Sequence, residues 1–375
     1  MKLRVEREVL ADAVAWAART LPTRPPLPVL AGLLLTAQED TLRLSGFDYE
    51  VSARVEIPAE VAEEGTVLVS GRLLADICRT LPDQPVVLSS VDTKVSLTCG
   101  PARFALLTLP LEEYPPLPAM PSATGSIAGD LLAHVVAQVV VAAGRDDTLP
   151  ALTGVRMEIE GERLTLAATD RYRLAVRELR WAPEQTGQSA VALVPARPLL
   201  DTARALSTAD KVTVALSTGG GEALIGFEGN GRQTTQRLLD GEFPKYRSLL
   251  PETSSSTAVV ATPLLLEALR RVSVVAERNT PVRLTVAPGS VQLDAGTGDE
   301  AQASETVEAA LNGEGLVIAF NPGYLHDGLA AVDDPYVCLS FTGPTRPAVI
   351  SGTDGPDQTP DDSYRYLLMP VRIAG

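Results

Sequence analysis

A single pattern of hydrophobic and polar positions occurs three times along the chain, at intervals of roughly 125 residues. Each copy starts with a short apolar strand pattern, continues through a turn or capping residue, and then has apolar residues at helical spacing. The three strand patterns are Val67–Val69, Ala192–Val194 and Val317–Ala319. Such a period is too long for a solenoid repeat and is typical of a whole domain. The sequence therefore predicts three related domains.

Each copy also contains a second helical pattern, which lies before the strand described above and is followed by an arginine. Alternating apolar residues come after that arginine, as expected for a strand with one buried face. The helical patterns are Leu10–Leu21, Leu131–Ala143 and Leu264–Ala276, the arginines are Arg24, Arg145 and Arg278, and the strands are Leu42–Leu44, Leu164–Leu166 and Val291–Leu293. Two helices and many short strands per copy predict an α+β fold with the helices on one face of the sheets.

The copies are separated by two stretches rich in Pro, Ser and Thr, near residues 116–125 and 251–258. Stretches of this composition are typical of connections between domains. We therefore expect a first domain over residues 1–120, a second over 126–250 and a third over 257–375.

Charge and cysteine content bear on whether the protein can bind nucleic acid and on the compartment in which it works. The chain has 47 acidic and 32 basic residues, which gives a formal net charge of −15. This total does not exclude nucleic-acid binding, because the charge of the binding surface decides phosphate affinity. Three scattered cysteines predict neither a disulfide framework nor a zinc site and favour the reducing cytoplasm. We also expect no signal peptide and no membrane span, since no apolar run is long enough.

Alignment of the copies places charged residues at matching positions of one predicted helix. The residues Arg72, Asp76 and Arg79 of the first copy match Arg197, Asp201 and Arg204 of the second, while Leu73, Leu74, Ile77 and Leu81 are expected to face the core. The third copy keeps Asp327 but has Gly323 and Ala330 in place of the arginines. Its other helix supplies Arg270 and Arg271.

These arginines have two interpretations. They could form ordinary solvated helix faces with ion pairs. They could instead bind the phosphates of a nucleic acid, and their recurrence in two copies favours this interpretation. Because the sequence has no helix-turn-helix, zinc finger or aromatic stacking platform, such binding would not depend on base sequence.

Residues that could form a catalytic or metal site are sparse. His134 and His326 lie in helical patterns, away in sequence from cysteines or carboxylates at metal spacing, and we expect structural or surface roles for both. Gly219–Gly221 lacks the Lys and Ser/Thr of a phosphate loop and predicts a hairpin turn. Asp48 and Asp170 follow strands at matching positions, where capping of a turn is favoured over acid–base chemistry. The sequence thus predicts no enzyme, metal or cofactor.

Four sequence motifs resemble those of one protein family. They are Arg24–Leu30, Ala168–Val176, Gly241–Tyr246 and Tyr366–Arg372. At these spacings, on a chain of three copies, the sequence resembles the bacterial sliding clamp, the beta subunit of DNA polymerase III, from end to end. Residues Arg145–Pro150 resemble actinobacterial members.

The resemblance implies a head-to-tail homodimer whose six domains form a ring, with helices inside around duplex DNA and sheets outside. The ring would tether the polymerase III alpha subunit, the clamp loader, and other polymerases and repair proteins through short linear peptides. The implied DNA-binding residues are Arg24, Arg72, Arg79, Arg197, Arg204, Arg270 and Arg271, and the implied dimer-interface residues are Phe104, Val274 and Val275.

The resemblance also implies a peptide-binding pocket between the second and third domains. Its residues would be Leu152, Thr169, Arg171, Tyr172, Arg173, Leu174, Pro244, Leu249, Leu367, Met369 and Pro370. Some clamps have a Gly-His pair where Arg171-Tyr172 stands, so the ligand preference of this pocket can differ. An alternative function is that of a duplicated clamp paralogue, which binds or protects against a ligand of the pocket.

Overall fold

The computed structural model describes residues 1–217, 223–276, 280–296 and 301–372. The predicted turn at Gly219–Gly221 and the predicted arginine Arg278 lie outside the described residues. The chain forms two compact units. Unit 1 comprises Met1–Ala133, Ala182–Gln185 and Asp201–Leu238, and unit 2 comprises His134–Trp181, Thr186–Leu200 and Leu239–Gly375. No helix in the described ranges is long and apolar enough to cross a membrane.

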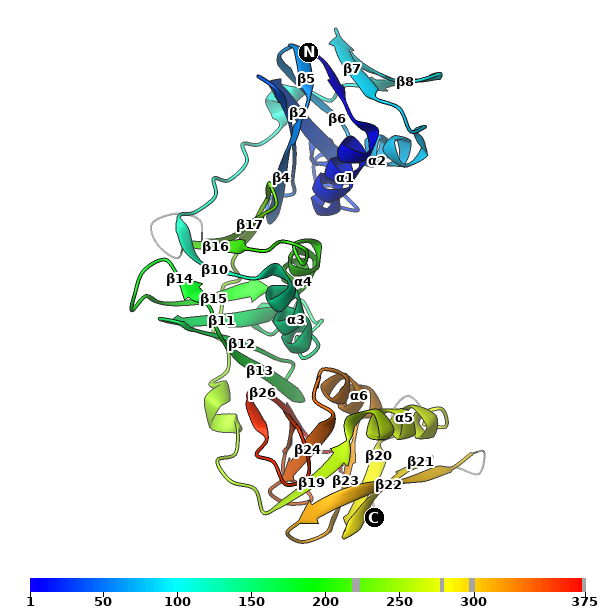
Figure 1. The fold of residues 1–375 in the computed structure, drawn as a ribbon, viewed down its shortest axis with the longest axis vertical. Coiled ribbons are helices and arrows are strands. Elements are labelled where there is room, and N and C mark those ends of the chain that lie inside the picture. The colour runs from blue at the N-terminus through cyan, green and yellow to red at the C-terminus, as the bar shows by residue number, and fades with distance from the viewer. Residues whose placement is uncertain (218–222, 277–279, 297–300, 373–375) are drawn as a thin grey trace. The chain divides into compact units, whose positions relative to one another are not determined.

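Unit 1 contains two antiparallel sheets and the helices α1 (Arg7–Ala17) and α2 (Gly71–Thr80), which pack against each other (Figure 1). One sheet has the order β5-β1-β7-β8-β9 and the other β14-β10-β16-β17-β18-β4-β3-β2-β6. The strands are β1 (Lys2–Val5), β2 (Gly32–Gln38), β3 (Thr41–Phe47), β4 (Val51–Pro58), β5 (Glu60–Glu63), β6 (Gly65–Ser70), β7 (Val86–Val91), β8 (Lys94–Cys99), β9 (Ala102–Leu107), β10 (Ala123–Ile127), β14 (Ala182–Pro183), β16 (Val212–Ser217), β17 (Leu224–Gly229) and β18 (Arg232–Arg237).

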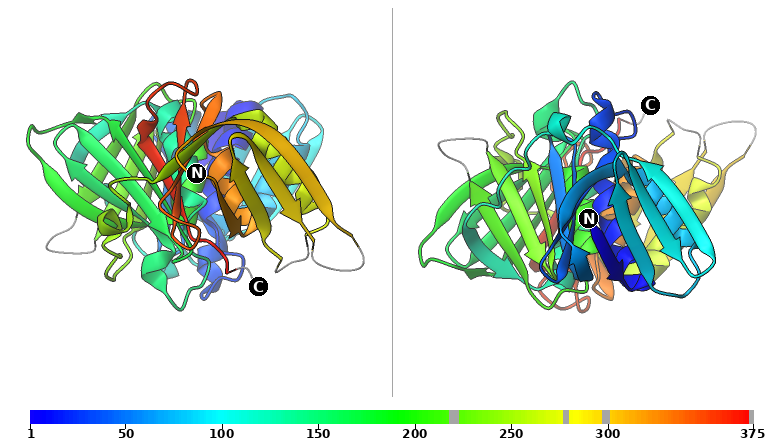
Figure 2. Two further views of the ribbon diagram at one scale, coloured as in Figure 1. Left: turned by 90° about the horizontal axis from the view of Figure 1, so that it is seen from below. Right: turned by 90° about the horizontal axis from the view of Figure 1, so that it is seen from above.

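Unit 2 contains α5 (Thr262–Ser273), α6 (Pro322–Ala330) and a strand series in the order β15-β11-β12-β13-β26-β25-β24-β19-β22-β21-β20-β23. The helix α5 packs on β21 and β22, which curve over it in the view from below (Figure 2). The strands are β11 (Gly154–Glu160), β12 (Arg163–Thr169), β13 (Arg173–Arg180), β15 (Ser189–Pro195), β19 (Ser256–Ala261), β20 (Val282–Ala287), β21 (Gly289–Ala295), β22 (Ala303–Asn312), β23 (Leu316–Phe320), β24 (Tyr336–Phe341), β25 (Ala348–Thr353) and β26 (Asp361–Leu368).

Two further helices, α3 (Gly129–Val140) and α4 (Ala196–Ala205), begin in one unit and end in the other. Short 3-10 turns complete the described elements. They are η1 (Ala18–Thr20), η2 (Pro28–Ala31), η3 (Leu111–Glu113), η4 (Pro150–Leu152) and η5 (Tyr246–Leu249). All six helical patterns of the sequence are confirmed, although the first one ends its α-helix at Ala17 and continues as the turn η1.

The buried side of α2 shows how the sequence pattern sets the packing. Leu74, Ile77 and Leu81 are buried, as the helical spacing predicts. Leu73 is half exposed, so its predicted place in the core was wrong. The buried stripe runs through Leu74, Ile77 and Cys78 at spacings of three and four residues, and Leu73 lies about 100° away from it on the helix.

Candidate functional site

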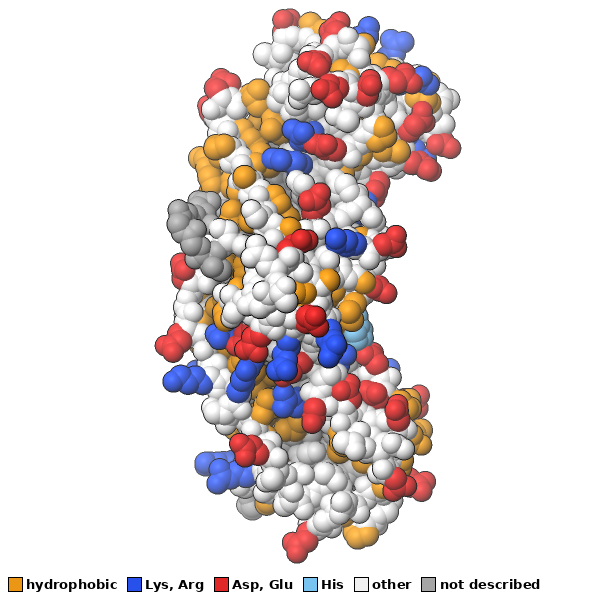
Figure 3. Space-filling view, turned by 60° about the vertical axis from the view of Figure 1, so that its left-hand side comes forward, with side chains coloured by type: hydrophobic (Ala, Val, Ile, Leu, Met, Phe, Trp, Pro, Cys, Tyr) orange, Lys and Arg blue, Asp and Glu red, His pale blue; other side chains and the backbone are white. Residues whose placement is uncertain are grey.

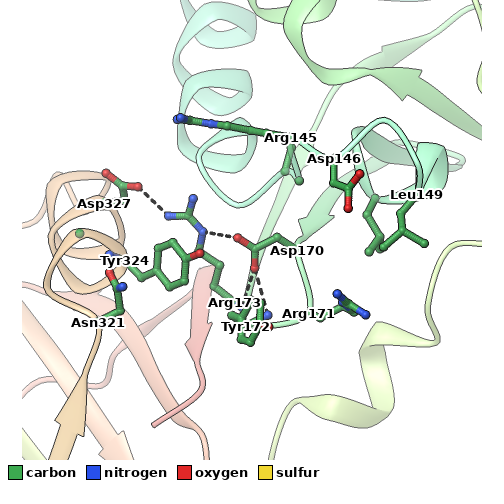
Figure 4. A pocket seen from close by; sticks show the side chains of 14 residues that line it. Arg145, Asp146, Leu149, Asp170, Arg171, Tyr172, Arg173, Asn321, Tyr324 and Asp327 are labelled. Atoms are coloured by element: carbon green, nitrogen blue, oxygen red, sulfur yellow. Dashed lines mark hydrogen bonds and ion pairs between the residues drawn. The ribbon is translucent and has the colours of Figure 1, made fainter. Parts of the chain in front are cut away.

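A cavity of about 590 Å³ lies in unit 2, where the turn between β12 and β13 meets the loop after α3 and the start of α6 (Figure 4). Its lining consists of Ala143, Gly144, Arg145, Asp146, Leu149, Leu152, Asp170, Arg171, Tyr172, Arg173, Asn321, Gly323, Tyr324 and Asp327. Aliphatic and aromatic side chains are combined here with a few convergent charged groups. This combination is typical of a ligand-binding site.

The turn between β12 and β13 is held by hydrogen bonds to two side chains. Asp170 Oδ1 accepts hydrogen bonds from the backbone N–H of Tyr172 (3.0 Å) and of Arg173 (3.1 Å). Thr169 Oγ1 accepts from the N–H of Arg171 at 3.2 Å and donates to the carbonyl of Arg173 at 2.6 Å. Asp170 therefore caps a turn, as predicted.

The matching turn of the first copy is built in the same way. Asp48 Oδ1 accepts hydrogen bonds from the N–H of Glu50 at 2.9 Å and of Val51 at 2.7 Å. The residue after the aspartate has a positive φ in both turns, 76° at Tyr49 and 80° at Arg171. The capping role of Asp48 is confirmed, and the two copies share a backbone conformation that side chains rarely adopt.

Arg173 is the charged centre of the cavity, with a side chain only 5% exposed. Its Nε donates to Asp170 Oδ2 at 2.9 Å, and its Nη1 donates to Asp327 Oδ2 at 2.6 Å and to the hydroxyl of Tyr366 at 3.4 Å. The guanidinium carbon also lies 4.2 Å from the ring centre of Tyr324 (Figure 4). Burial alone would lower the pKa of Arg173, but Tyr366, Asp327 and Asp170 outweigh it and raise the pKa above its usual value. The guanidinium therefore stays charged and joins the turn to α6.

Two tyrosines form an aromatic wall of the cavity. The rings of Tyr172 and Tyr324 are stacked, with their centres 6.4 Å apart. Tyr324 is positioned by the start of α6, where Asn321 Oδ1 accepts a hydrogen bond from its N–H at 3.0 Å. Tyr172 is 55% exposed, so its ring presents apolar surface to an incoming ligand.

The structure brings together four of the predicted pocket residues, Leu152, Arg171, Tyr172 and Arg173, in the lining of this cavity. Thr169 does not line the cavity, but its hydroxyl holds the turn through its hydrogen bonds with Arg171 and Arg173. The C-terminal residue Met369 adjoins the turn, because its N–H donates to the carbonyl of Tyr172 at 2.9 Å. Pro370 follows it directly, and neither residue lines the cavity.

Two other predicted pocket residues, Leu174 and Leu367, belong to an apolar cluster of unit 2. Leu174 and Leu367 are buried there beside Phe243 and Tyr246 of the segment that leads to the third copy. Pro244 lies between these two aromatic residues in sequence, and Leu249 is 50% exposed. The cluster fixes the path of this segment.

A smaller cavity of about 230 Å³ lies between α3 and α6. Its lining consists of His134, Ala137, Gln138, Val141, His326, Asp327, Ala330, Ala331 and Asp333. His134 Nε2 lies 2.8 Å from Asp333 Oδ2, and His326 Nε2 accepts a hydrogen bond from Arg270 Nε at 3.3 Å. Within the described ranges, no group of three or more His, Cys, Asp or Glu side chains is placed to hold a metal ion.

All seven predicted DNA-binding arginines are exposed. Arg72 donates to the carbonyl of Pro22 at 3.0 Å, and Arg79 pairs with Asp76 at 2.9 Å on the helix face that the sequence predicted. Arg271 is held by Glu305 at 2.6 Å. Figure 3 shows one face of the molecule, where acidic and basic side chains are interspersed and basic ones form only local groups.

The predicted dimer-interface residues lie at the surface. Val274 directly follows α5 and is 82% exposed, which is unusual for a large apolar side chain. Val275 and Phe104 are partly exposed, the latter on β9.

Three family models match the chain in sequence order. They are the N-terminal domain of the DNA polymerase III beta subunit over residues 1–118, the central domain over 126–245 and the C-terminal domain over 247–372. The chain belongs to the beta sliding clamp family.

Relatives of this clamp match it along its whole length. It is 60% identical to the beta sliding clamp of Streptomyces coelicolor and 49% identical to the beta sliding clamp homolog GriR of Streptomyces muensis, with full coverage of both chains in each case. A crystal structure of the Pseudomonas aeruginosa sliding clamp bound to griselimycin covers the whole chain, with a TM-score of 0.91 and 29% identity. The resemblance to an actinobacterial sliding clamp is thereby confirmed.

Sequence reasoning missed several residues that line the cavity of this clamp. They are Asp146 and Leu149 of the loop after α3, Asn321 and Tyr324 at the start of α6, and Asp327 within it. Asp327 could have been found from the sequence, because it matches Asp76 and Asp201 in the other copies. Asn321 could have been found as well, because it directly precedes Pro322, as the capping residue at the start of a helix does.

Proposed function

We propose that two copies of the clamp join head to tail into a ring around duplex DNA, and that the cavity of unit 2 holds short peptides of partner proteins. The partners are the DNA polymerase III alpha subunit, the clamp loader, other polymerases and repair proteins, all in the cytoplasm. Each copy carries three clamp domains, over residues 1–120, 126–250 and 257–375. The observation that carries this proposal is a pair of complementary sheet edges.

Within each unit, the last strand of one repeat continues a sheet of the repeat before it. In unit 1 β18 pairs with β4, and in unit 2 β26 pairs with β13. The strands β4, β13 and β22 occupy the same position in their three repeats, because each forms an antiparallel pair with the strand before it. Among the described strands, β22 pairs along Ala303–Ala309 only with β21, and β9, the last strand of the first repeat, pairs only with β8. These two edges are those that a second copy would join.

The internal junctions also predict the register between copies. Thr234 of β18 lies opposite Ala53 of β4, and these residues match Phe104 and Ala303 in the repeat. The β18–β4 junction thus predicts that Phe104 lies opposite Ala303 of the second copy. The β26–β13 junction, carried over in the same way, predicts the same register, because Tyr366 matches Phe104 and lies opposite Ala175, which matches Ala303.

The helices support the same arrangement. Val141 directly follows α3 and lines the smaller cavity together with Ala330, the last residue of α6, and Ala331, which follows it. Val274 follows α5 at the matching position, and α2 of the first repeat matches α6. Two copies joined through β9 and β22 would therefore bury Val274 against α2 of the second copy.

Exposed arginines on α4 supply the argument for DNA binding. Arg197 and Arg204 are exposed, seven residues apart, and form no ion pair with another described residue. Two helical turns separate them, so both lie on one stripe. Guanidinium groups without a base-reading motif bind phosphates and not base sequence.

Reversal of the charges on α4 should weaken DNA binding and flatten its salt dependence. For the double variant R197E/R204E, we expect the slope of log K against log salt concentration to fall by roughly 0.9 for each lost phosphate contact. Fluorescence anisotropy with duplex DNA over a salt series measures this slope. The matched control is R163E/R180E, which makes the same charge change at exposed positions of β12 and β13. Equal slopes in both double variants would contradict a role for α4.

The cavity of unit 2 supplies the argument for peptide binding. Leu149 and Leu152 give it apolar surface, and Tyr172 adds its exposed ring to the lining. A leucine or phenylalanine anchor that is fully enclosed contributes about 1.5–3 kcal/mol, which suits exchange among partners. The sliding clamp of Pseudomonas aeruginosa has been crystallised bound to griselimycin, so a clamp of this fold can hold a ligand.

A synthetic peptide from the polymerase partner with a leucine anchor should bind the wild-type clamp and bind L152A about tenfold more weakly. The loss corresponds to a missing apolar contact of about 1.4 kcal/mol. Calorimetry on the dimer measures both affinities. L264A is the matched control, because Leu264 on α5 is 53% exposed and lies outside the cavity lining. Equal affinity of the wild type and L152A would exclude this cavity as the anchor site.

The alternative function is that of a duplicated paralogue that binds or protects against a pocket ligand. It is supported by the 49% identity to a chain described as a clamp homolog. Polymerase processivity on primed circular DNA separates the two functions. A replication clamp should extend product length, and a paralogue should leave it unchanged while still binding the ligand.

A further inference from the structure

The turn between β12 and β13 does not explain why residue 171 is an arginine. The φ of 80° is a conformation in which a residue with a side chain is strained, and glycine is not. The same turn in the first copy has Tyr49 at this place, so the backbone does not require an arginine. The hydrogen bonds at this turn use the backbone N–H of Arg171 and leave its guanidinium free of them.

The guanidinium of Arg171 lies at the wall of the cavity. Figure 4 shows it on the side of Leu149, pointing away from the centre that Arg173 occupies. The two charges differ in their surroundings. Arg173 is neutralised by two carboxylates within 2.9 Å. Arg171 is exposed and forms no ion pair within 4.0 Å with another described residue.

Asp146 is the acidic side chain of the cavity lining on which the charge of Arg171 acts. Asp146 Oδ1 accepts hydrogen bonds from the N–H and the hydroxyl of Thr148, at 3.0 and 2.7 Å. These bonds lower the pKa of the Asp146 carboxyl, and the charge of Arg171 lowers it further. Asp146 and Arg171 line the same cavity (Figure 4) and form no ion pair with each other within 4.0 Å.

We propose that Arg171 selects, among the peptides that enter this cavity, those that carry a carboxylate next to their apolar anchor. The inference rests on the proposed peptide-binding function. An anchor that packs on Leu149 and Leu152 brings its neighbouring residues within reach of Arg171, because these side chains line the same cavity. Arginine binds carboxylates with two parallel hydrogen bonds and recognises this planar group better than lysine does. The carboxylate belongs either to an Asp or Glu side chain or to the peptide's own C-terminus.

The Asp146 carboxylate should weaken the binding of a ligand carboxylate to Arg171, and this effect can be tested separately. A ligand carboxylate that approaches Arg171 is repelled by the Asp146 carboxylate. Asparagine at position 146 removes the charge and keeps an oxygen that can accept the Thr148 hydrogen bonds. R171G and D146N should therefore change the affinity for an acidic peptide in opposite directions.

The experiment compares pairs of synthetic leucine-anchored peptides by calorimetry with the full-length clamp. One series carries Asp or Asn at each position around the anchor in turn, with an amidated C-terminus. A second series has no acidic residue and carries either a free or an amidated C-terminus. For one position in one series, we expect the wild type to prefer the carboxylate about five- to tenfold, within the range of charge-assisted hydrogen bonds.

The variants identify the residue responsible. R171G should lower the affinity for the acidic peptides more than the affinity for the neutral peptides, and so remove the preference, whereas D146N should increase the preference. Y49G is the matched control, because it makes the same backbone change in the turn of the first copy. If wild type and R171G prefer the carboxylate equally, or if the wild type binds both members of every pair equally, the proposal for Arg171 is overturned. If no peptide binds, the proposed function of the cavity fails instead.

Discussion

Replacing Val274 with aspartate should convert the clamp from a dimer into a monomer of 39.6 kDa. Val274 is 82% exposed in the single chain, so the substitution leaves the fold intact. In the proposed ring this side chain is buried against α2 of the second copy. An aspartate buried there without a partner costs about 3–5 kcal/mol. This cost weakens association by a factor of roughly 10²–10³.

Light scattering over a concentration series measures the effect, with the wild type as the dimeric reference at micromolar concentration. V191D is the matched control, because Val191 on β15 is also exposed and has no place in the proposed junction. Retention on circular DNA should be lost together with the dimer. A V274D protein that keeps the mass of the wild type would contradict the arrangement derived from the strand edges.

Replacing Arg173 with alanine should strongly destabilise unit 2 and abolish peptide binding. The variant leaves Asp170 and Asp327 without their shared cation and opens space beside Tyr324. Removal of one partner from a buried ion pair costs about 3–5 kcal/mol. Because Arg173 also joins the β12–β13 turn to α6, its loss should separate two walls of the cavity.

Urea unfolding followed by tyrosine fluorescence reports the stability, and calorimetry reports the peptide affinity. R177A is the matched control on the same strand, because Arg177 pairs only at 3.7 Å with the half-exposed Asp361 and donates to Ser363. We expect R177A to shift the unfolding midpoint much less and to keep the affinity. If R173A were as stable as R177A, the network around Arg173 would not hold unit 2 together.

The local features of the fold could be predicted from the sequence because each repeat carries its own signals. Alternating and helical spacings identify the strands and helices, and the capping aspartates Asp48 and Asp170 act on N–H groups only two or three residues away. Leu73 shows the limit of this reasoning. In α2 the neighbours Ile77 and Cys78 are both buried, whereas Leu73 beside the buried Leu74 is half exposed, so the packing decides where the buried face ends.

The cavity could be predicted only in part because it depends on contacts distant in sequence. The family motif marks Arg171 and Arg173, but Asp327 reaches Arg173 from 154 residues away. This approach requires β26 to pair with β13, a register that no local pattern encodes. Leu174 and Leu367 lie opposite each other in that pairing and face the apolar cluster. The open edges at β9 and β22 are likewise visible only once the pairing of every other strand is known.

The two histidines of the chain offer a spectroscopic view of one small region. His134 and His326 both line the cavity between α3 and α6, and Asp327 lines this cavity and the larger one. Imidazole ring protons give magnetic resonance signals whose positions depend on the surroundings of the ring. Two such signals can be assigned by single substitutions in a protein of this size. Comparison of the two signals with and without a peptide would show whether binding in the larger cavity changes the surroundings of the smaller one, because Asp327 lines both.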